Sequence, residues 1–286
     1  MKVGVSTYSL YGAIEKGEMD VLAIIDWIGA NGGEHVEIVP FGFALETNRE
    51  LDEVKKRAAA AGLEISSYTI EAQLLQPTEK EFQAEVDRLK KEVDKAHRLG
   101  VKLMRHDVAS REPEEATIQN FMKDLPKLVE GCQAVADHAA QYGITTSVEN
   151  HGYHCQHSDR VQLLVSSVDR PNYKTTIDTG NFVCVDEDPI FAVRKNLPIA
   201  SMVHVKDFYR RPAEENPGEG WFPSSNGTHL RGAIFGQGDL DVRKILREVK
   251  KSGYDGYISL EFEGMEECRE ACKIGMDNIR RIWAEV

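Results

Sequence analysis

Eight short apolar or alternating runs, each followed by a stretch with helical spacing of apolar residues, most tightly constrain how this chain can fold. The strand-like runs are "KVGVST", "HVEIV", "LEISSYT", "VKLMRHDV", "ITTSVEN", "KTTIDTGN", "ASMVHVKDF" and "GYISLEFEG". Helices are predicted near 19–30, 47–61, 77–100, 114–142, 158–168, 187–196 and 241–252, with a terminal helix reaching about 284. Regular alternation of strands and helices favours a parallel sheet with helical crossovers.

Eight such units in 286 residues match the size of a (β/α)₈ TIM barrel of the α/β class, with residues 1–286 as a single domain. A doubly wound open sheet is the competing architecture. It would normally place a glycine-rich phosphate turn after the first strand, and "VSTYSLYG" is not such a turn. The longest irregular segment, 209–238, is expected to be a lid-like insertion.

Composition limits the classes of partner. The formal net charge of −12 opposes binding to nucleic acid and to anionic membranes, which need a lysine and arginine footprint. No apolar run is long enough to span a bilayer, and the first residues lack the pattern of a signal peptide. Five scattered cysteines without a signal peptide favour free thiols. We therefore expect a cytoplasmic protein with no membrane and no nucleic-acid partner.

Polar side chains recur at the carboxyl ends of the last four predicted strands. Because side chains alternate between the two faces of a strand, Glu149, Asp178, His204 and Glu261 are expected to point toward the barrel axis. That end of a barrel is where enzymes of this fold build their sites.

Three carboxylates gathered at one end of the barrel repel each other, so they either take up protons or bind a cation. One imidazole with three carboxylates is an oxygen-rich set that favours Mn²⁺, with Mg²⁺, Co²⁺ or Fe²⁺ as alternatives. A lone inward histidine is more often a hydrogen-bonded core residue, and a lone glutamate is often part of a salt bridge. The matched orientation of four such residues favours a metal site.

Four further residues are candidates for substrate contact. His106, taken as inward on the fourth strand, and His151 are candidate proton donors or substrate ligands, although structural histidines look the same in sequence. Glu37 is a candidate ligand for a substrate hydroxyl, with a buried salt bridge as the alternative. Lys206 is expected to contact a carboxylate or a substrate oxygen.

The motifs "SVENHG", "TIDTGN", "HVKDF", "FGQGDLD" and "GYISLEFEG" resemble, in order, those of the xylose isomerase-like barrel superfamily of sugar isomerases and epimerases. The resemblance covers nearly the whole chain and is clearest from 143 to 264. It implies one divalent metal bound by Glu149, Asp178, His204 and Glu261. It also implies that the two glutamates act as an acid/base pair on opposite faces of the reacting carbon.

Two positions refine this resemblance. Arg210 lies six residues after His204, where ketose 3-epimerases of the superfamily carry a substrate-binding arginine. Asn181 stands where those epimerases carry a histidine, which weakens the match to a plain ketose epimerase while keeping Asn181 as a substrate-binding candidate. "HVKD" with "GQGDLD" is also similar to inosose dehydratases and isomerases. Related barrels are often dimers or tetramers, so a homo-oligomer is expected.

The sequence therefore predicts a divalent-metal-dependent isomerase or epimerase that acts on a keto-sugar or cyclitol through an enediolate, with Glu149 and Glu261 as acid/base groups. The alternative is a lyase on the same scaffold, which would dehydrate an inosose or cleave a 3-oxo-glycoside by elimination. A DNA repair nuclease of this fold and a non-catalytic sugar-binding barrel are further hypotheses. The net charge and the carboxylate-rich site disfavour the nuclease.

Overall fold

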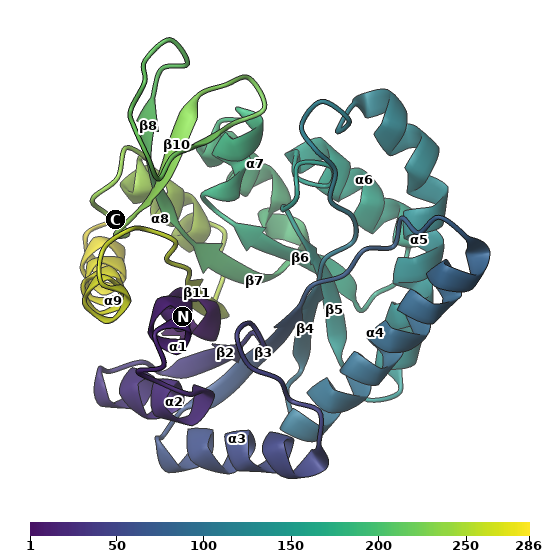
Figure 1. The fold of residues 1–286 in the computed structure, drawn as a ribbon, viewed down its shortest axis with the longest axis horizontal. Coiled ribbons are helices and arrows are strands. Elements are labelled where there is room, and N and C mark those ends of the chain that lie inside the picture. Colours follow the sequence, from purple (N-terminus) through teal and green to yellow (C-terminus); the bar gives the residue numbers. More distant parts are fainter.

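The computed structural model describes all residues 1–286 and contains the predicted closed barrel of eight parallel strands (Figure 1). Around the barrel the strands follow the order β1-β11-β7-β6-β5-β4-β3-β2. Their bounds are β1 Lys2–Ser6, β2 His35–Ile38, β3 Glu64–Ile70, β4 Leu103–His106, β5 Thr145–Glu149, β6 Tyr173–Asp178, β7 Ala200–Val205 and β11 Tyr257–Leu260. The chain is therefore a single-domain TIM barrel.

Helices surround the strands, as Figure 1 shows. Those predicted from the sequence are α2 Val21–Ala30, α3 Asn48–Ala60, α4 Glu79–Leu99, α5 Ile118–Ala140, α6 Ser158–Val168, α7 Pro189–Asn196, α8 Val242–Lys251 and α9 Cys268–Glu285. Four short helices were not predicted from the sequence. They are η1 Thr7–Leu10, α1 Tyr11–Glu15, η2 Asn181–Val185 and η3 Leu197–Ile199. None of the helices combines the length and the apolar character needed to cross a membrane.

Local sequence signals explain where the helices begin and end. The Thr47 hydroxyl accepts from the backbone N–H of Glu50, whose carboxylate in turn accepts from the N–H of Thr47, so α3 begins with a capping box. At the end of α4, Gly100 adopts a φ of 85°, a left-handed conformation that glycine reaches at low cost. Apolar residues from the strands and from the surrounding helices together form one buried core of 67 residues.

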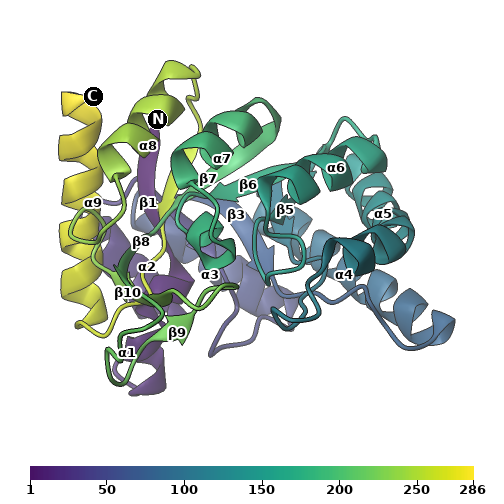
Figure 2. The ribbon, with the colours of Figure 1, turned by 90° about the horizontal axis from the view of Figure 1, so that it is seen from above.

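The segment predicted to be irregular contains a small antiparallel sheet, which corrects the expectation for 209–238. Its strands are β8 Asp207–Arg211, β9 Phe222–Pro223 and β10 His229–Ala233, in the order β8-β10-β9. The sheet lies at the carboxyl end of the barrel, on the same side as α1 (Figure 2). Pairing between segments about twenty residues apart leaves little periodic signal in either one, so the strands were not predicted.

Asp207 fastens this insertion to the barrel. Its buried carboxylate accepts from the backbone N–H groups of Gly236, Gly238 and Leu240, at 2.9 to 3.3 Å, and from that of Phe208. A Cβ at Gly238 would lie 2.3 Å from the carboxylate, so only glycine fits there. The "GQGDL" motif is thus the backbone cradle of a buried carboxylate.

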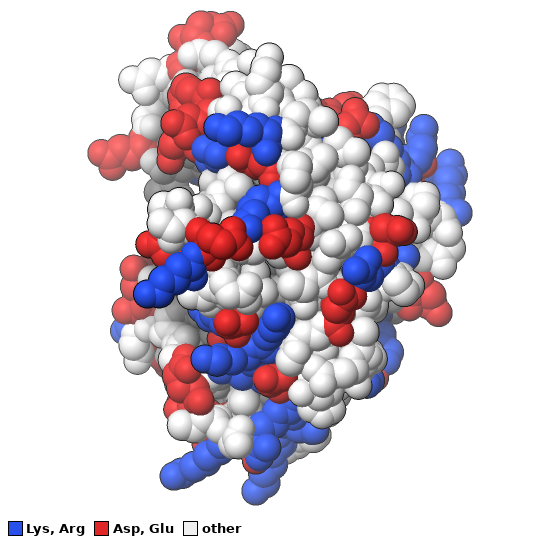
Figure 3. All heavy atoms as spheres, turned by 90° about the vertical axis from the view of Figure 1, so that its right-hand side faces the viewer, with Lys and Arg blue, Asp and Glu red and all other residues white.

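Lysine and arginine side chains are interspersed with aspartate and glutamate on the face shown in Figure 3. Charges of both signs therefore share this surface. Exposed ion pairs are common in the protein, for example that of Arg57 with Asp26.

Replacing Asp207 with alanine would leave several backbone N–H groups without an acceptor. We expect Asp207→Ala to lower the free energy of unfolding by about 3 kcal/mol, measured by urea denaturation. Asp26→Ala, which breaks only an exposed pair with Arg57, is the control and should cost less than about 1 kcal/mol. Equal effects of the two changes would contradict the anchoring role of Asp207.

Candidate metal centre

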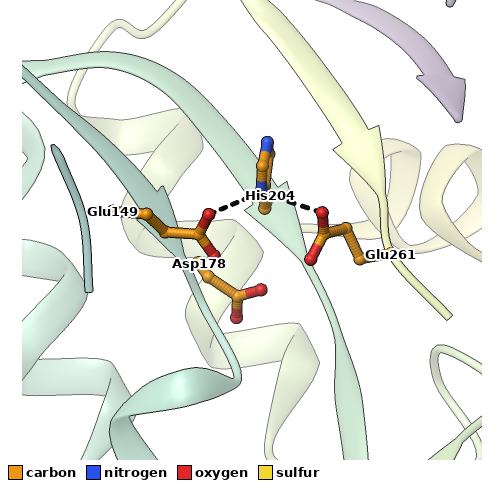
Figure 4. A group of neighbouring side chains, drawn as sticks. All are labelled: Glu149, Asp178, His204 and Glu261. Carbon is orange, nitrogen blue, oxygen red and sulfur yellow. Dashed lines mark ion pairs between the residues drawn. The ribbon is translucent and has the colours of Figure 1, made fainter. Parts of the chain in front are cut away.

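Four side chains from four neighbouring strands converge at the carboxyl end of the barrel. Glu149 ends β5, Asp178 ends β6, His204 lies within the last two residues of β7, and Glu261 follows β11 directly. All four are buried, and one potential ligand atom from each lies within 4.8 Å of the others (Figure 4). The structure thus brings together the four side chains that the alternation pattern placed on the inward face.

Two buried polar atoms in this cluster lack hydrogen-bond partners. They are Nδ1 of His204 and Oδ2 of Asp178. Nδ1 lies 3.6 Å from Glu149 Oε2 and 3.4 Å from Glu261 Oε1, as the dashed lines in Figure 4 indicate. Unsatisfied buried polar atoms are costly, and a cation among them would satisfy both. The donor set is oxygen-rich with one imidazole, so the cluster could hold a divalent metal ion.

Glu37 orients the imidazole ring of His204. Its carboxylate lies 3.0 Å from Nε2 of His204 and accepts from the Thr69 hydroxyl at 2.5 Å. This contact leaves Nδ1 as the ring nitrogen that faces the carboxylates, an arrangement typical of metal-binding histidines. The expectation that Glu37 binds a substrate hydroxyl finds no support, because the side chain is fully buried and does not line the cavity described below.

The fourth strand has the opposite orientation to the predicted one. Arg105 pairs in register with Thr69 and Ser147 and faces the barrel axis, whereas His106 is fully buried beside the ring of Tyr173. The prediction that His106 points inward is therefore wrong. In "LMRH" each face carries one apolar and one polar residue, so the alternation of side chains could not decide between the two orientations.

Arg105 balances the charge on the β5 side of the cluster. Its guanidinium lies 2.7 Å from Glu149 Oε2 and 2.8 Å from Asp107 Oδ1, and the side chain is almost fully buried. Asp107 also lies 3.1 Å from Nδ1 of His151, which is half exposed. A chain of paired charges thus runs from Glu149 to His151 along the cavity wall.

Lys206 balances the charge on the other side. Its ammonium lies 3.2 Å from Glu261 Oε2 and 3.0 Å from Glu263 Oε1. Asn181 links the two sides, because its amide nitrogen donates to Glu149 Oε1 at 3.1 Å and its oxygen accepts from Lys206 at 3.4 Å. Lys206 and His151 line the cavity, whereas Asn181 lies behind it.

The two glutamates differ in acidity. Burial alone would raise the pKa of Glu149, but Arg105 and His204 together hold it well below its ordinary value. Burial raises the pKa of Glu261 to about 7, against the lowering effect of His204 and Lys206. For His151, partial loss of solvent at the cavity wall lowers the pKa, but the adjacent Asp107 carboxylate outweighs this effect and raises the pKa to about 9. One glutamate therefore favours the ionised form and the other retains a proton near neutral pH.

A cavity of about 970 Å³ opens above the cluster. It extends from Glu149, Glu261 and Lys206 across the loops after β1, β2 and β3 to Glu92 and Lys95 on α4. No residue of 209–238 is among those that line it. Arg210 is exposed on β8 and also lies outside the lining, which gives its assignment to substrate binding no support.

Four of the polar residues that line this cavity lie beside the cluster or its charged partners and were not predicted from the sequence: Tyr8, Arg105, Asp107 and Glu263. Glu263 could have been found, because it lies two residues after Glu261 and therefore shares its side of the chain. Arg105 also carried a signal, since a charged residue inside a buried strand needs a partner of opposite charge. Tyr8 lies in the short helix η1 and Asp107 in the loop after β4, and neither segment has a periodic pattern that indicates direction.

The geometry is that of a barrel with a candidate metal centre at the carboxyl ends of its strands. The family model described as "Xylose isomerase-like TIM barrel" matches residues 25–282. The chain therefore belongs to the xylose isomerase-like TIM barrel family.

Similar proteins include enzymes of two reaction types. An inosose dehydratase from Lacticaseibacillus casei is 25% identical over 138 residues, which cover 48% of this chain and 46% of that protein. The chain thus spans about half the length of the first curated relatives that it matches. Among solved structures, a 3-keto-D-glucoside 4-epimerase from E. coli has a TM-score of 0.75 at 15% identity, covering 98% of this chain and 99% of that one.

A xylose isomerase-like TIM barrel protein from Mycobacterium smegmatis, solved in complex with magnesium, has a TM-score of 0.72 at 18% identity. The match covers 94% of this chain and 90% of that chain. At these identities the two solved structures show that the fold is shared.

Removing the imidazole should abolish tight metal binding. We expect one Mn²⁺ per chain by isothermal titration calorimetry, and at a hundredfold excess over Kd a stabilisation of about 2.7 kcal/mol, seen as a rise in Tm. His204→Gln should lose both effects. The control is His138→Gln, which changes a histidine on α5 whose contacts are with Asp94, Gln141 and Tyr142 and not with the cluster. Unchanged Mn²⁺ binding by His204→Gln would contradict the assignment.

Metal binding should depend on pH because it displaces protons from the cluster. Glu261 holds a proton up to about pH 7, and His204, whose pKa is lowered by burial but raised far more by Glu37, Glu261 and Glu149, holds another. The apparent affinity for Mn²⁺ is expected to rise by more than about tenfold per pH unit below pH 7. Glu261→Gln should make this dependence shallower by about one proton, and an unchanged slope would contradict it.

Proposed function

We propose that the protein is a divalent-metal-dependent enzyme that moves a proton at the carbon next to the carbonyl of a keto-sugar or cyclitol, as an isomerase or epimerase. The observation that carries this proposal is the placement of Glu149 and Glu261 on opposite sides of His204, within one buried four-residue cluster. Two carboxyl groups on opposite sides of one buried site are the arrangement that proton transfer on two sides of one carbon requires.

Glu149, Asp178, His204 and Glu261 would hold the metal. A divalent cation in this position would polarise a substrate carbonyl and stabilise the negative charge that develops when the neighbouring carbon loses its proton. Mn²⁺ is the ion that we favour, because three carboxylates and one imidazole form a mixed set of hard and borderline ligands.

Each residue then has a defined task. Glu149, kept ionised by Arg105, is the base that accepts the proton. Glu261 is the acid that returns a proton from the other side. Lys206 holds Glu261 and Glu263 in place through its ammonium group. His151, held by Asp107 at the cavity wall, is a donor for a substrate oxygen.

The charges around the cavity support a substrate without phosphate. Each arginine and lysine that lines it is paired with a carboxylate. The pairs are Arg88 with Glu85, Lys95 with Glu46 and Glu92, Arg105 with Glu149 and Asp107, and Lys206 with Asp178, Glu261 and Glu263. A phosphate group would find no unpaired cation and several carboxylates, which disfavours its binding.

A second candidate function is dehydration of a keto-cyclitol. The naming of the curated relatives as inosose dehydratases favours it, as does the presence of two cationic donors, His151 and Lys206, that line the cavity. Either could protonate a departing hydroxyl after Glu149 has taken the proton from the neighbouring carbon. Both functions begin with removal of the proton from the carbon next to the carbonyl. They differ in the next step, which returns a proton in an isomerase or epimerase and expels a hydroxyl group in a dehydratase.

Incubation of the Mn²⁺-loaded protein with a panel of ketoses and inososes in D₂O tests both functions. We expect NMR to show deuterium at the carbon next to the carbonyl, with a stereoisomer as product if epimerisation follows and an unsaturated or dehydrated product if elimination follows. Glu149→Gln and Glu261→Gln should each slow exchange by about a hundredfold or more. Their metal content should be measured in parallel, because both residues are also candidate ligands.

The exposed Glu130→Gln on α5 is the matched control and should exchange at the unmodified rate. Absence of exchange across the whole panel in protein that contains one Mn²⁺ per chain would contradict the proposed function.

A further inference from the structure

The cavity is larger than a single sugar ring requires. Its volume of about 970 Å³ lies near the upper end of the range for pockets that enclose drug-sized ligands. The candidate metal centre occupies only the part beneath the ends of β5, β6, β7 and β11. The remainder extends over the loops after β1, β2 and β3, and it would stay unfilled if a monosaccharide or a cyclitol bound at the cluster.

An aromatic group forms part of this second region. The ring of Phe41 lies 5.3 Å from that of Tyr8 and 4.6 Å from that of Tyr11, in edge-to-face geometry. Phe41 and Tyr8 both line the cavity and are only partly buried. Phe43 lines it as well. Tyr8 also lies close to Glu263, and burial together with this carboxylate raises its pKa, so its hydroxyl stays protonated as a donor.

The backbone of the β2–α3 loop holds the Phe41 ring in this position. Gly42 adopts a φ of 78°, and a Cβ there would lie 2.8 Å from the ring of Tyr11. The preceding turn is closed by a hydrogen bond from the N–H of Phe41 to the carbonyl of Val39 at 2.8 Å. The chain therefore uses a constrained turn to place an aromatic ring at the cavity.

Phe41 does not serve the core. It belongs neither to the buried hydrophobic cluster nor to the partly buried residues packed against it, although the neighbouring Phe43 does. Its ring contacts the two tyrosines and the cavity. An aromatic ring positioned by a turn that requires glycine, outside the core and beside a candidate active site, is suited to stacking on the apolar face of a ligand.

We propose that the substrate is a glycoside: the reacting ring lies at the four-residue cluster, and a second group joined to it lies against Phe41 and Tyr8. This inference rests on the proposed function and adds the class of substrate to it. A second sugar and a planar aglycone both offer an apolar face to an aromatic ring. The lining carries no unpaired cation, so the second group is uncharged or positively charged.

Binding of stable glycosides to the Mn²⁺-loaded protein tests the inference without requiring turnover. The probes are D-glucose, methyl β-D-glucopyranoside, phenyl β-D-glucopyranoside and cellobiose, with affinities from calorimetry and contacts from saturation-transfer NMR. We expect phenyl glucoside, cellobiose or both to bind about tenfold more tightly than methyl glucoside. Which of the two binds more tightly distinguishes a planar aglycone from a second sugar.

Phe41→Ala should remove most of this preference and leave the affinity for methyl glucoside unchanged, whereas Phe41→Tyr should retain it. Because Phe41 lies outside the core, the alanine variant is expected to fold normally. Phe191→Ala is the control, since Phe191 is an exposed phenylalanine on α7 that stacks with Arg194. Equal affinities for all four probes, no binding of any probe, or a preference that survives Phe41→Ala would overturn the inference.

The two proposals fail in different ways. A protein that exchanges deuterium into free ketoses but shows no preference for larger glycosides keeps the proposed function and loses this inference. A protein that prefers glycosides in a Phe41-dependent way but exchanges no deuterium keeps the second binding region and loses the proposed chemistry.

Discussion

The rest of the site depends on one constraint, which is the repulsion among three buried carboxylates at the carboxyl end of the barrel. They belong to Glu149, Asp178 and Glu261. Carboxylates removed from water must bind a cation, accept a proton or pair with a basic group. This structure shows the second and third of these means and offers a place for the first. Arg105 and Lys206 flank the cluster, Glu261 retains a proton to about pH 7, and Nδ1 of His204, which has no hydrogen-bond partner, faces the position that a metal would occupy.

This balance also gives the two glutamates different properties. Arg105 lies against Glu149, whereas Lys206 divides its charge among Asp178, Glu261 and Glu263. Because the cation on the β5 side is shared with only one other carboxylate, Glu149 is the more acidic of the pair. The barrel makes this asymmetry possible, since each residue comes from a different strand and its surroundings can change independently of the others.

The sequence predicted the barrel well because each of its units carries two periodic signals, one for the strand and one for the helix. It predicted the four candidate ligands because valines and isoleucines on either side define which way each strand faces. The same reasoning failed on β4, where two apolar residues, Leu103 and Met104, are followed by two polar ones, Arg105 and His106, so that either face could have been buried. It also could not reveal the β8–β10 sheet or the Phe41 turn, which depend on contacts between distant segments and on backbone conformation.

The membership of the xylose isomerase-like family is consistent with this account but does not choose among its reactions, since the similar proteins include a dehydratase and an epimerase. The most direct measurement of the central claim is the anomalous scattering of a crystal of the protein grown with Mn²⁺. The account predicts a single strong peak at bonding distance from His204 Nδ1 and from oxygens of Glu149, Asp178 and Glu261. A peak elsewhere, or none, with Lys206 still bridging the carboxylates, would contradict it.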